Sequence, residues 1–328
     1  MKVYDDQLIV VTGGAGFIGS GVIKHLNDQG LSNILVVDDL GCDEKWRNLV
    51  GKKFLEIISP HEIFGWLEGK ERWIEAFIHL GACTDTTETD ADYLLDVNYR
   101  FSVDLAEYAE KNDIKFIYAS SAATYGDGKK GFSDDHALLE TYEPLNMYGF
   151  SKHLFDLWVK DQGLIDQFVG LKYFNVFGPN ESHKGRMASV ITHFLPQIKQ
   201  TGKVKLFQSN EPERFSHGDQ KRDFIYVKDV ARITCSFLKK DVGGIYNVGS
   251  GEANTWNRLT KAIFIALGLE PHIDYIPMPA DLEGKYQNYT CADVAKLRHV
   301  LGEEAKTISL EDAVVEYVQQ YLVPGRLW

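Results

Sequence analysis

Short apolar runs alternate with amphipathic stretches along the first half of the chain. The run LIVVT at 8–12 leads into a glycine-rich turn, an amphipathic stretch to about Gly30 and a second apolar run, NILVVDD. Apolar runs of this length separated by segments of helical period are typical of βαβ units, whose strands lie parallel. The pattern therefore predicts a strand, a helix and a parallel second strand.

The same alternation continues to about residue 174. The apolar runs AFIHLGA at 76–82 and KFIYASS at 115–121 flank an amphipathic stretch at 97–112, and a helix near 146–161 precedes the run FVGLKYF at 168–174. Helices that alternate with buried strands predict an α/β fold, a Rossmann-type doubly wound parallel sheet.

After Asn175 the rhythm loosens, and loops with Pro179 and Gly202 separate shorter elements. We expect a Rossmann domain over 1–174 and a smaller α/β lobe over most of 175–328. Two later segments, GIYNVGS and the helix TWNRLTKAIFIALG, are candidates to return to the first domain. A length of 328 residues is enough for two such units.

Composition narrows the class of protein. With 35 basic and 47 acidic residues the net charge is −12, which argues against a nucleic-acid partner. No apolar run approaches the roughly 18 residues of a membrane span, and the first residues do not resemble a signal peptide. The four cysteines form no C-x-x-C pair, so we expect neither a disulfide framework nor a metal site. A cytoplasmic protein with no membrane partner is predicted.

Gly13, Gly16 and Gly19 lie three residues apart between the first strand and its helix. Such a turn lets backbone amides approach a pyrophosphate at the helix N-terminus. Asp38, about twenty residues on, ends the next strand, where a carboxylate binds the adenosine ribose. The motif predicts dinucleotide binding. Asp38 favours NAD, whereas Lys45 and Arg47 nearby suit the 2′-phosphate of NADP, so these residues leave the cofactor open.

Tyr148 and Lys152 form Y-x-x-x-K on the predicted helix at 146–161, a spacing that puts both on one face. A lysine ammonium beside a phenol lowers the pKa of the tyrosine, so that it exchanges protons with a substrate alcohol. Ser120 and Ser121 end the preceding strand, at the sheet edge where ligands bind. Together these residues predict an active site for an alcohol and its ketone.

The motifs TGGAGFIGS, VVDD, HLGA, YASSAATYG and YGFSK together resemble the extended short-chain dehydrogenase/reductase superfamily over nearly the whole chain. The related dehydratases carry an Asp-Glu pair where this chain has Ala122 and Ala123, so dehydration lacks its acid and base. The cofactor-binding residues that the resemblance implies are Gly13, Gly16, Phe17, Ile18, Gly19, Asp38, Asp39, Lys45, Leu80, Gly81, Ala82, Cys83, Asn98 and Lys152.

Within that superfamily, GPNESHKGRMAS, LNMYGFSK, GACTDTTE and KYQNYTCAD look like the ADP-glyceromanno-heptose 6-epimerase family. The resemblance implies that Tyr148 and Lys184 are the two acid/base residues, that Ser121 orients the reacting oxygen, and that Lys152 tunes the tyrosine and holds the nicotinamide ribose. The substrate-binding residues that it implies are Ser121, Asn175, Val176, His183, Lys184, Arg222 and Tyr286.

This family resemblance implies a reaction and an assembly. NADP, with NAD as the alternative, transiently oxidises C6″ of ADP-D-glycero-D-manno-heptose and returns the hydride to the opposite face, supplying heptose for the lipopolysaccharide inner core. The resemblance also implies a homo-oligomer, which would be a pentamer. A UDP-sugar 4-epimerase and a non-catalytic dinucleotide-sensing module are the alternatives.

Two stretches depart from the family pattern. Arg186 stands where a small residue is usual, and the loop from Phe207 to Asp223 is longer than expected, which leaves Gln208 and Ser209 open as substrate contacts. Arg222 has two interpretations, an ion pair with Asp223 or a guanidinium fork for the substrate diphosphate, and the second is favoured.

Overall fold

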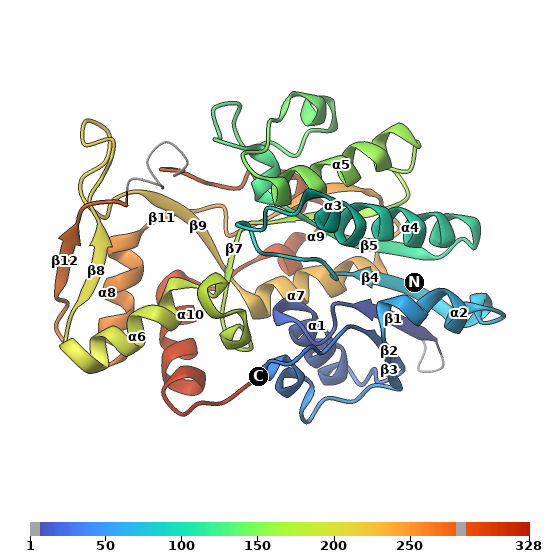
Figure 1. The fold of residues 1–328 in the computed structure, drawn as a ribbon, viewed down its shortest axis with the longest axis horizontal. Helices are drawn as coiled ribbons and strands as arrows, with labels where there is room; N and C mark the ends of the chain where they lie inside the picture. The colour runs from blue at the N-terminus through green and yellow to red at the C-terminus, as the bar shows by residue number, and fades with distance from the viewer. Residues whose placement is uncertain (1–6, 280–286) are drawn as a thin grey trace.

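A seven-stranded parallel sheet forms the centre of the computed structural model, which describes residues 7–279 and 287–328 (Figure 1). Its strand order is β10-β6-β5-β4-β1-β2-β3. The order reverses at β1, so the carboxyl ends of β1 and β4 form a crevice for a ligand. The strands are β1 (Leu8–Thr12), β2 (Ile34–Val37), β3 (Glu56–Ile58), β4 (Ile74–His79), β5 (Lys115–Ser121), β6 (Val169–Tyr173) and β10 (Gly244–Val248).

Helices cover both faces of this sheet because its strands are apolar on both sides. Ile9 and Val11 pack with residues of α1 (Phe17–Asp28), α7 (Val227–Ser236) and α9 (Ala295–Leu301). Leu8 and Val10, which point the opposite way, pack with the other helices. These are α2 (Ile63–Leu67), α4 (Phe101–Lys111) and α5 (Met147–Asp161). The predicted fold class, a doubly wound Rossmann-type sheet with a smaller lobe, is confirmed.

The amphipathic stretch predicted at 97–112 is more complex than one helix. It begins earlier, with α3 (Ala91–Leu95), and passes through a π-helical turn at Asp96–Arg100 before α4. The wide turn carries Asn98, whose side chain is fully buried. π-turns inside helices often occur at functional sites, and nothing in the hydrophobic period signals one.

A smaller lobe follows β6 and has its own apolar core. It holds two small sheets, β11-β9-β7 and β12-β8, and three helices that pack against them. Their bounds are β7 (Asn175–Phe177), β8 (Val204–Phe207), β9 (Lys221–Tyr226), β11 (Ala253–Thr255), β12 (Ile273–Ile276), α6 (Val190–Thr201), α8 (Trp256–Ala266) and α10 (Leu310–Glu316).

The chain crosses between sheet and lobe several times. GIYNVGS contains β10, which pairs with β6 in the main sheet. The helix TWNRLTKAIFIALG is α8, whose Leu259 and Ile263 lie in the core of the lobe. In the part of the chain that is described, no helix has the length and apolarity to cross a membrane.

Candidate active site

A cavity of about 620 Å³ lies at the carboxyl ends of the central strands, where the sheet meets the segment Ser182–Met187 of the lobe. Most of the residues predicted from the motifs line it together. The predicted residues on its wall are Gly13, Gly16, Phe17, Ile18, Gly19, Asp38, Lys45, Leu80, Gly81, Ala82, Cys83, Ser121, Tyr148, Lys152, Asn175, Val176, His183 and Lys184.

The glycine-rich turn is built for close backbone approach. A Cβ on Gly19 would lie 2.1 Å from the Gly13 carbonyl oxygen, and one on Gly13, whose φ is +66°, would lie 2.7 Å from the Gly81 nitrogen. Helix α1 then begins with no side-chain cap on its first amides. Uncapped amides at a helix N-terminus bind phosphate oxygens, so the turn fits a pyrophosphate.

Asp38, at the end of β2, is held in place from two sides. Its Oδ2 accepts a hydrogen bond of 2.8 Å from the Ala15 amide of the glycine turn, and its Oδ1 accepts one of 2.9 Å from Lys45 Nζ. The lysine therefore neutralises the carboxylate that would repel a 2′-phosphate. Arg47 instead pairs with Glu44 on the surface.

Ser121, Tyr148 and Lys152 come together on the cavity wall between β5 and α5. Burial raises the pKa of the Tyr148 phenol, and a hydrogen bond with Ser121 acts in the opposite direction. Burial lowers the pKa of Lys152 to about 8. The sequence-based expectation of a lowered tyrosine pKa is therefore wrong for the protein by itself, because burial of the phenol is the largest effect.

A buried polar cluster lies behind these three residues. Asp156, one turn after Lys152 on α5, is fully buried and pairs with Lys172 Nζ at 2.5 Å. Asp156 also accepts hydrogen bonds from Ser120 Oγ at 2.7 Å and Tyr118 Oη at 3.1 Å. Ser120 is thus turned toward the interior, and Ser121 is the serine that faces Tyr148.

Lys184 reaches the cavity from the lobe. It lies in the segment Ser182–Met187, and its Nζ is 5.7 Å from the centroid of the Phe17 ring at the start of α1. Burial lowers the pKa of this lysine, while the nearby Glu181 carboxylate acts to raise it. Beside it, His183 Nδ1 lies 3.2 Å from Asn48 Nδ2. The segment therefore brings a cation and an imidazole over the glycine turn.

Three of the predicted residues that the structure describes, Asp39, Asn98 and Arg222, do not line this cavity. Asp39 accepts a hydrogen bond of 2.8 Å from Ser59 Oγ. Asn98 lies beneath the wall, where its side chain binds the backbone of Cys83 with hydrogen bonds of 2.8 and 3.0 Å, so it shapes the wall from behind. Arg222 lies beside Trp256 in the lobe, 5.7 Å from the ring centroid. Tyr286 falls outside the described residues.

Sequence reasoning missed several wall residues, which are Asp43, Thr84, Asp85, Thr86, Ala119, Tyr173, Phe174 and Met187. Most of them lie next to residues that were predicted, at the carboxyl ends of β4, β5 and β6. Their position in the chain, just after predicted strands, could have identified them, because the loops after parallel strands meet at one edge of the sheet. The motifs single out only residues with recognisable chemistry.

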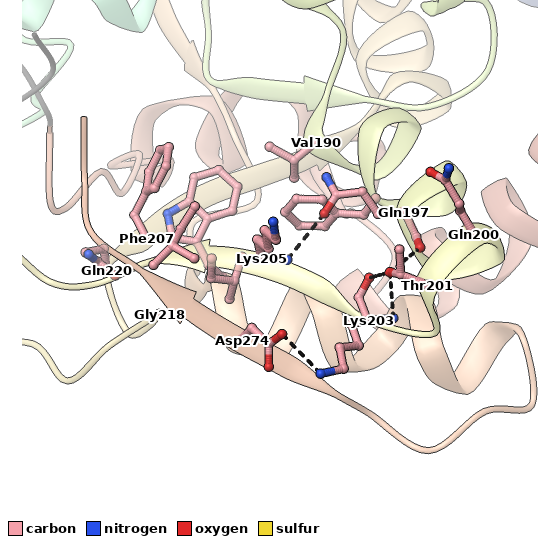
Figure 2. A pocket seen from close by; sticks show the side chains of 14 residues that line it. Val190, Gln197, Gln200, Thr201, Lys203, Lys205, Phe207, Gly218, Gln220 and Asp274 are labelled. Carbon is pink, nitrogen blue, oxygen red and sulfur yellow. Dashed lines mark hydrogen bonds and ion pairs between the residues drawn. The ribbon is translucent and has the colours of Figure 1, made fainter.

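A second cavity, of about 850 Å³, lies in the lobe between α6 and the β8-β12 pair (Figure 2). Phe194, Phe207 and Trp256 give it apolar walls. Two buried polar atoms on its lining residues, Gln220 Oε1 and Trp256 Nε1, have no hydrogen-bond partner among the described residues. The aromatic and apolar walls suit a flat ring, whereas the two unpaired atoms expose almost no surface to the cavity.

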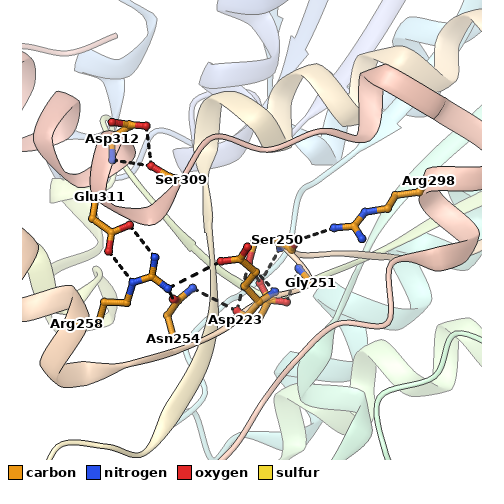
Figure 3. A network of polar contacts seen from close by, with 10 residues as sticks. Asp223, Ser250, Gly251, Asn254, Arg258, Arg298, Ser309, Glu311 and Asp312 are labelled. Carbon is orange, nitrogen blue, oxygen red and sulfur yellow. Dashed lines mark hydrogen bonds and ion pairs between the residues drawn. The ribbon is translucent and has the colours of Figure 1, made fainter.

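Asp223 organises the strands next to this second cavity (Figure 3). Its buried carboxylate accepts hydrogen bonds from the amides of Ser250, Gly251 and Ala292, at 2.7 to 3.0 Å. The same network includes a two-bond pair between Arg258 and Glu311. Asp223 therefore fixes β9, and with it the backbone of Arg222, through backbone amides.

The doubly wound sheet and its cavity define a dinucleotide-binding α/β protein. Comparison with known families agrees with this class. The profile of the NAD dependent epimerase/dehydratase family matches residues 9–249. The chain belongs to this family, and a nicotinamide dinucleotide is its cofactor.

Individual relatives narrow the class. The chain is 48% identical to the ADP-L-glycero-D-manno-heptose-6-epimerase of Nitratidesulfovibrio vulgaris strain DP4, over 96% of this chain and 98% of the relative. It is 46% identical to the protein of that name from Fusobacterium nucleatum, with the same coverage. The solved structure of the Helicobacter pylori ADP-L-glycero-D-manno-heptose-6-epimerase matches with a TM-score of 0.81 and 29% identity, over 96% of each chain. The resemblance to this epimerase family is confirmed.

Proposed function

We propose that this protein interconverts ADP-D-glycero-D-manno-heptose and ADP-L-glycero-D-manno-heptose by transient oxidation at C6″. The observation that carries the proposal is that Ser121, Tyr148, Lys152 and Lys184 line one cavity with the glycine turn, although Lys184 comes from a different part of the fold. The names of the relatives support the choice of sugar.

Two acid/base groups serve the two faces of the reacting carbon. The hydrogen on a secondary alcohol carbon is not acidic, so it leaves the carbon as a hydride. A bound nicotinamide would accept this hydride and later return it. Tyr148 accepts the proton of one epimer's hydroxyl while Ser121 holds the oxygen. After the side chain of the resulting ketone has rotated, Lys184 gives a proton to the oxygen on the other face.

NADP is the proposed dinucleotide. Lys45 is bonded to Asp38 in the pocket that receives the adenosine ribose, and its ammonium offsets the repulsion between Asp38 and a 2′-phosphate. Burial, and to a smaller extent Lys45, lowers the pKa of His183, so the neutral imidazole is a second candidate neighbour for the phosphate as a hydrogen-bond donor. NAD, which lacks this phosphate, would gain nothing from the Lys45 ammonium.

The nucleotide end of the substrate is assigned to the lobe cavity. Its aromatic walls, formed by Phe194, Phe207 and Trp256, suit a purine base. Met187 lines the cofactor cavity and Val190 the lobe cavity, so two residues just before α6, Ala188 and Ser189, separate the two linings along the chain. In this assignment the domain over 1–174 holds the dinucleotide and the lobe holds the nucleotide sugar.

A reducing cytoplasmic location and a homo-oligomer complete the proposal. All four cysteines, Cys42, Cys83, Cys235 and Cys291, are free thiols, which is the usual state in a reducing compartment. Light scattering on the purified protein tests the oligomer, and a monomer would contradict it.

Incubation of the purified protein with ADP-D-glycero-D-manno-heptose tests the function. We expect chromatography to show the L-glycero epimer, with no net consumption of dinucleotide. Lys184→Met should lower turnover on the order of 10²-fold, as expected for loss of a positioned proton-transfer group. Activity on UDP-glucose with none on the ADP-heptose would instead identify a 4-epimerase. Dinucleotide binding without turnover of either sugar would leave a sensing module.

A further inference from the structure

Arg186 joins two walls of the cofactor cavity that come from distant parts of the chain. Its guanidinium lies 3.1 Å from Asp85 Oδ2, across a sequence separation of 101 residues. Asp85 belongs to the loop after β4, which lines the cavity from Leu80 to Thr86, and Arg186 follows Lys184 in the lobe. Family resemblance leads one to expect a small residue at this position, so the ion pair is a feature of this chain.

The acceptor of this ion pair is arranged in advance. Asp85 Oδ1 accepts hydrogen bonds from the amide and the hydroxyl of Thr87, at 2.8 and 2.6 Å, which leaves Oδ2 to receive Arg186. The guanidinium also donates to Thr87 Oγ1. The pKa of Asp85 is lowered to about 2, mainly by the hydrogen bonds from Thr87 and next by the hydrogen bond from Arg186. The carboxylate therefore stays charged at any pH at which the enzyme works.

Gly185 separates the functions of its two neighbours. Its backbone, at φ +53° and ψ −123°, breaks the helical turn of Ser182–Met187. Lys184 then lies on the cavity wall, while Arg186 extends over the outside toward Asp85. The ion pair between Arg186 and Asp85 therefore restrains the segment Ser182–Met187, which carries Lys184.

We propose that Arg186 is a positioning residue whose ion pair with Asp85 holds the segment of Lys184 against the loop at 83–87 and slows escape of the dinucleotide. The proposal rests on the proposed place of the dinucleotide in this cavity, and it does not depend on which sugar the enzyme converts. An epimerase gains from slow escape because the hydride taken from a substrate must return to it.

Release of NADPH tests the proposal. Protein loaded with NADPH is mixed with excess NADP, and the loss of bound-NADPH fluorescence gives the release rate. We expect Arg186→Met and Asp85→Asn each to raise this rate roughly two- to five-fold, the range for one exposed ion pair. The double variant should be no faster than either single variant, because both remove the same contact. In about 1 M salt, which screens the ion pair, the wild-type rate should rise toward that of the variants.

Arg214→Met is the matched control. Arg214 is as exposed as Arg186, and its ion-pair partner Glu211 lies three residues away on the same loop. Neither Arg214 nor Glu211 lines the cofactor cavity, so the release rate of this variant should equal that of the wild type. The proposal is overturned if Arg186→Met and Asp85→Asn both release NADPH at the wild-type rate. It is also overturned if the release rate of the double variant is raised by the product of the two single effects. A higher KM for the sugar in Arg186→Met alone would make Arg186 a substrate contact and also overturn it. Failure of the wild type to bind NADPH would instead refute the assignment of the cavity.

Discussion

Tyr148, Lys152 and Ser121 show how burial changes the chemistry of a motif. In water a lysine beside a phenol promotes its ionisation, yet burial raises the pKa of Tyr148 and lowers that of Lys152 to about 8. Both shifts favour the neutral forms, as expected when two ionisable groups leave water. Asp156 opposes the shift of Lys152, since its carboxylate acts to raise the pKa of the lysine. In the protein by itself the phenol of Tyr148 is therefore neutral, which is the form that donates a proton to the ketone, and it must lose its own proton before it can accept one from the alcohol.

Tyr148→Phe should remove turnover and spare binding. The substitution deletes one hydroxyl and little volume, so the cavity keeps its shape while the proton acceptor is lost. We expect kcat to fall on the order of 10²-fold or more, with the affinity for dinucleotide within about two-fold of wild type. Steady-state kinetics and NADPH titration measure the two quantities. Turnover near that of wild type would assign the proton transfer to another group.

The lowered pKa of Lys152 predicts that enzyme activity falls in alkaline solution. Its folded pKa of about 8 lies below the ordinary value of 10.5, so the ammonium that we propose holds the nicotinamide ribose loses its proton as pH rises through 8. We expect kcat/KM to decline above pH 8. In Lys152→Arg the overall rate should be lower, but this decline should be absent because a guanidinium stays charged. The same decline in that variant would assign it to a different group.

At the scale of elements, the predicted strands agree closely with the structure, and the reason is local. LIVVT and KFIYASS match β1 and β5 to the residue, because a strand buried on both faces needs an unbroken apolar run. The lobe was predicted less well, since its strands of three or four residues, such as β7 and β11, are too short to show a period. The pairing of Arg186 with Asp85 has no local signal at all, because it depends on how two distant loops meet.

The glycine turn supports a prediction at this scale. A Cβ on Gly19 would meet the Gly13 carbonyl oxygen at 2.1 Å, which forces the turn and the start of α1 apart. Gly19→Ala should therefore abolish NADPH binding, measured by titration, while circular dichroism still shows a folded protein. Gly65→Ala, in α2, is the control, because a Cβ there meets nothing within 4 Å. Retained binding in Gly19→Ala would mean that the pyrophosphate lies elsewhere.

At the scale of the whole molecule, the two cavities divide the work between sheet and lobe. The cofactor cavity has walls from both parts, whereas the lobe cavity is built from α6, β8, β12 and their neighbours. A ligand of either cavity stabilises the folded chain against unfolding, by about 2.7 kcal/mol at a hundred times its Kd. Two independent ligands should therefore give two separate gains in stability.

Thermal unfolding with ADP and NADP separates the two sites. With an unfolding entropy of about 2.1 cal/mol/K per residue, each gain of about 2.7 kcal/mol corresponds to a rise in Tm of about 4 °C for this chain, and we expect ADP to raise the Tm further when NADP is already saturating. Phe207→Ala removes an aromatic wall of the lobe cavity only, so it should abolish most of the ADP shift and leave the NADP shift intact. If ADP stabilises this variant as much as wild type, the base does not bind in the lobe cavity. If NADP already abolishes the ADP shift in wild type, the two ligands compete for the cofactor cavity.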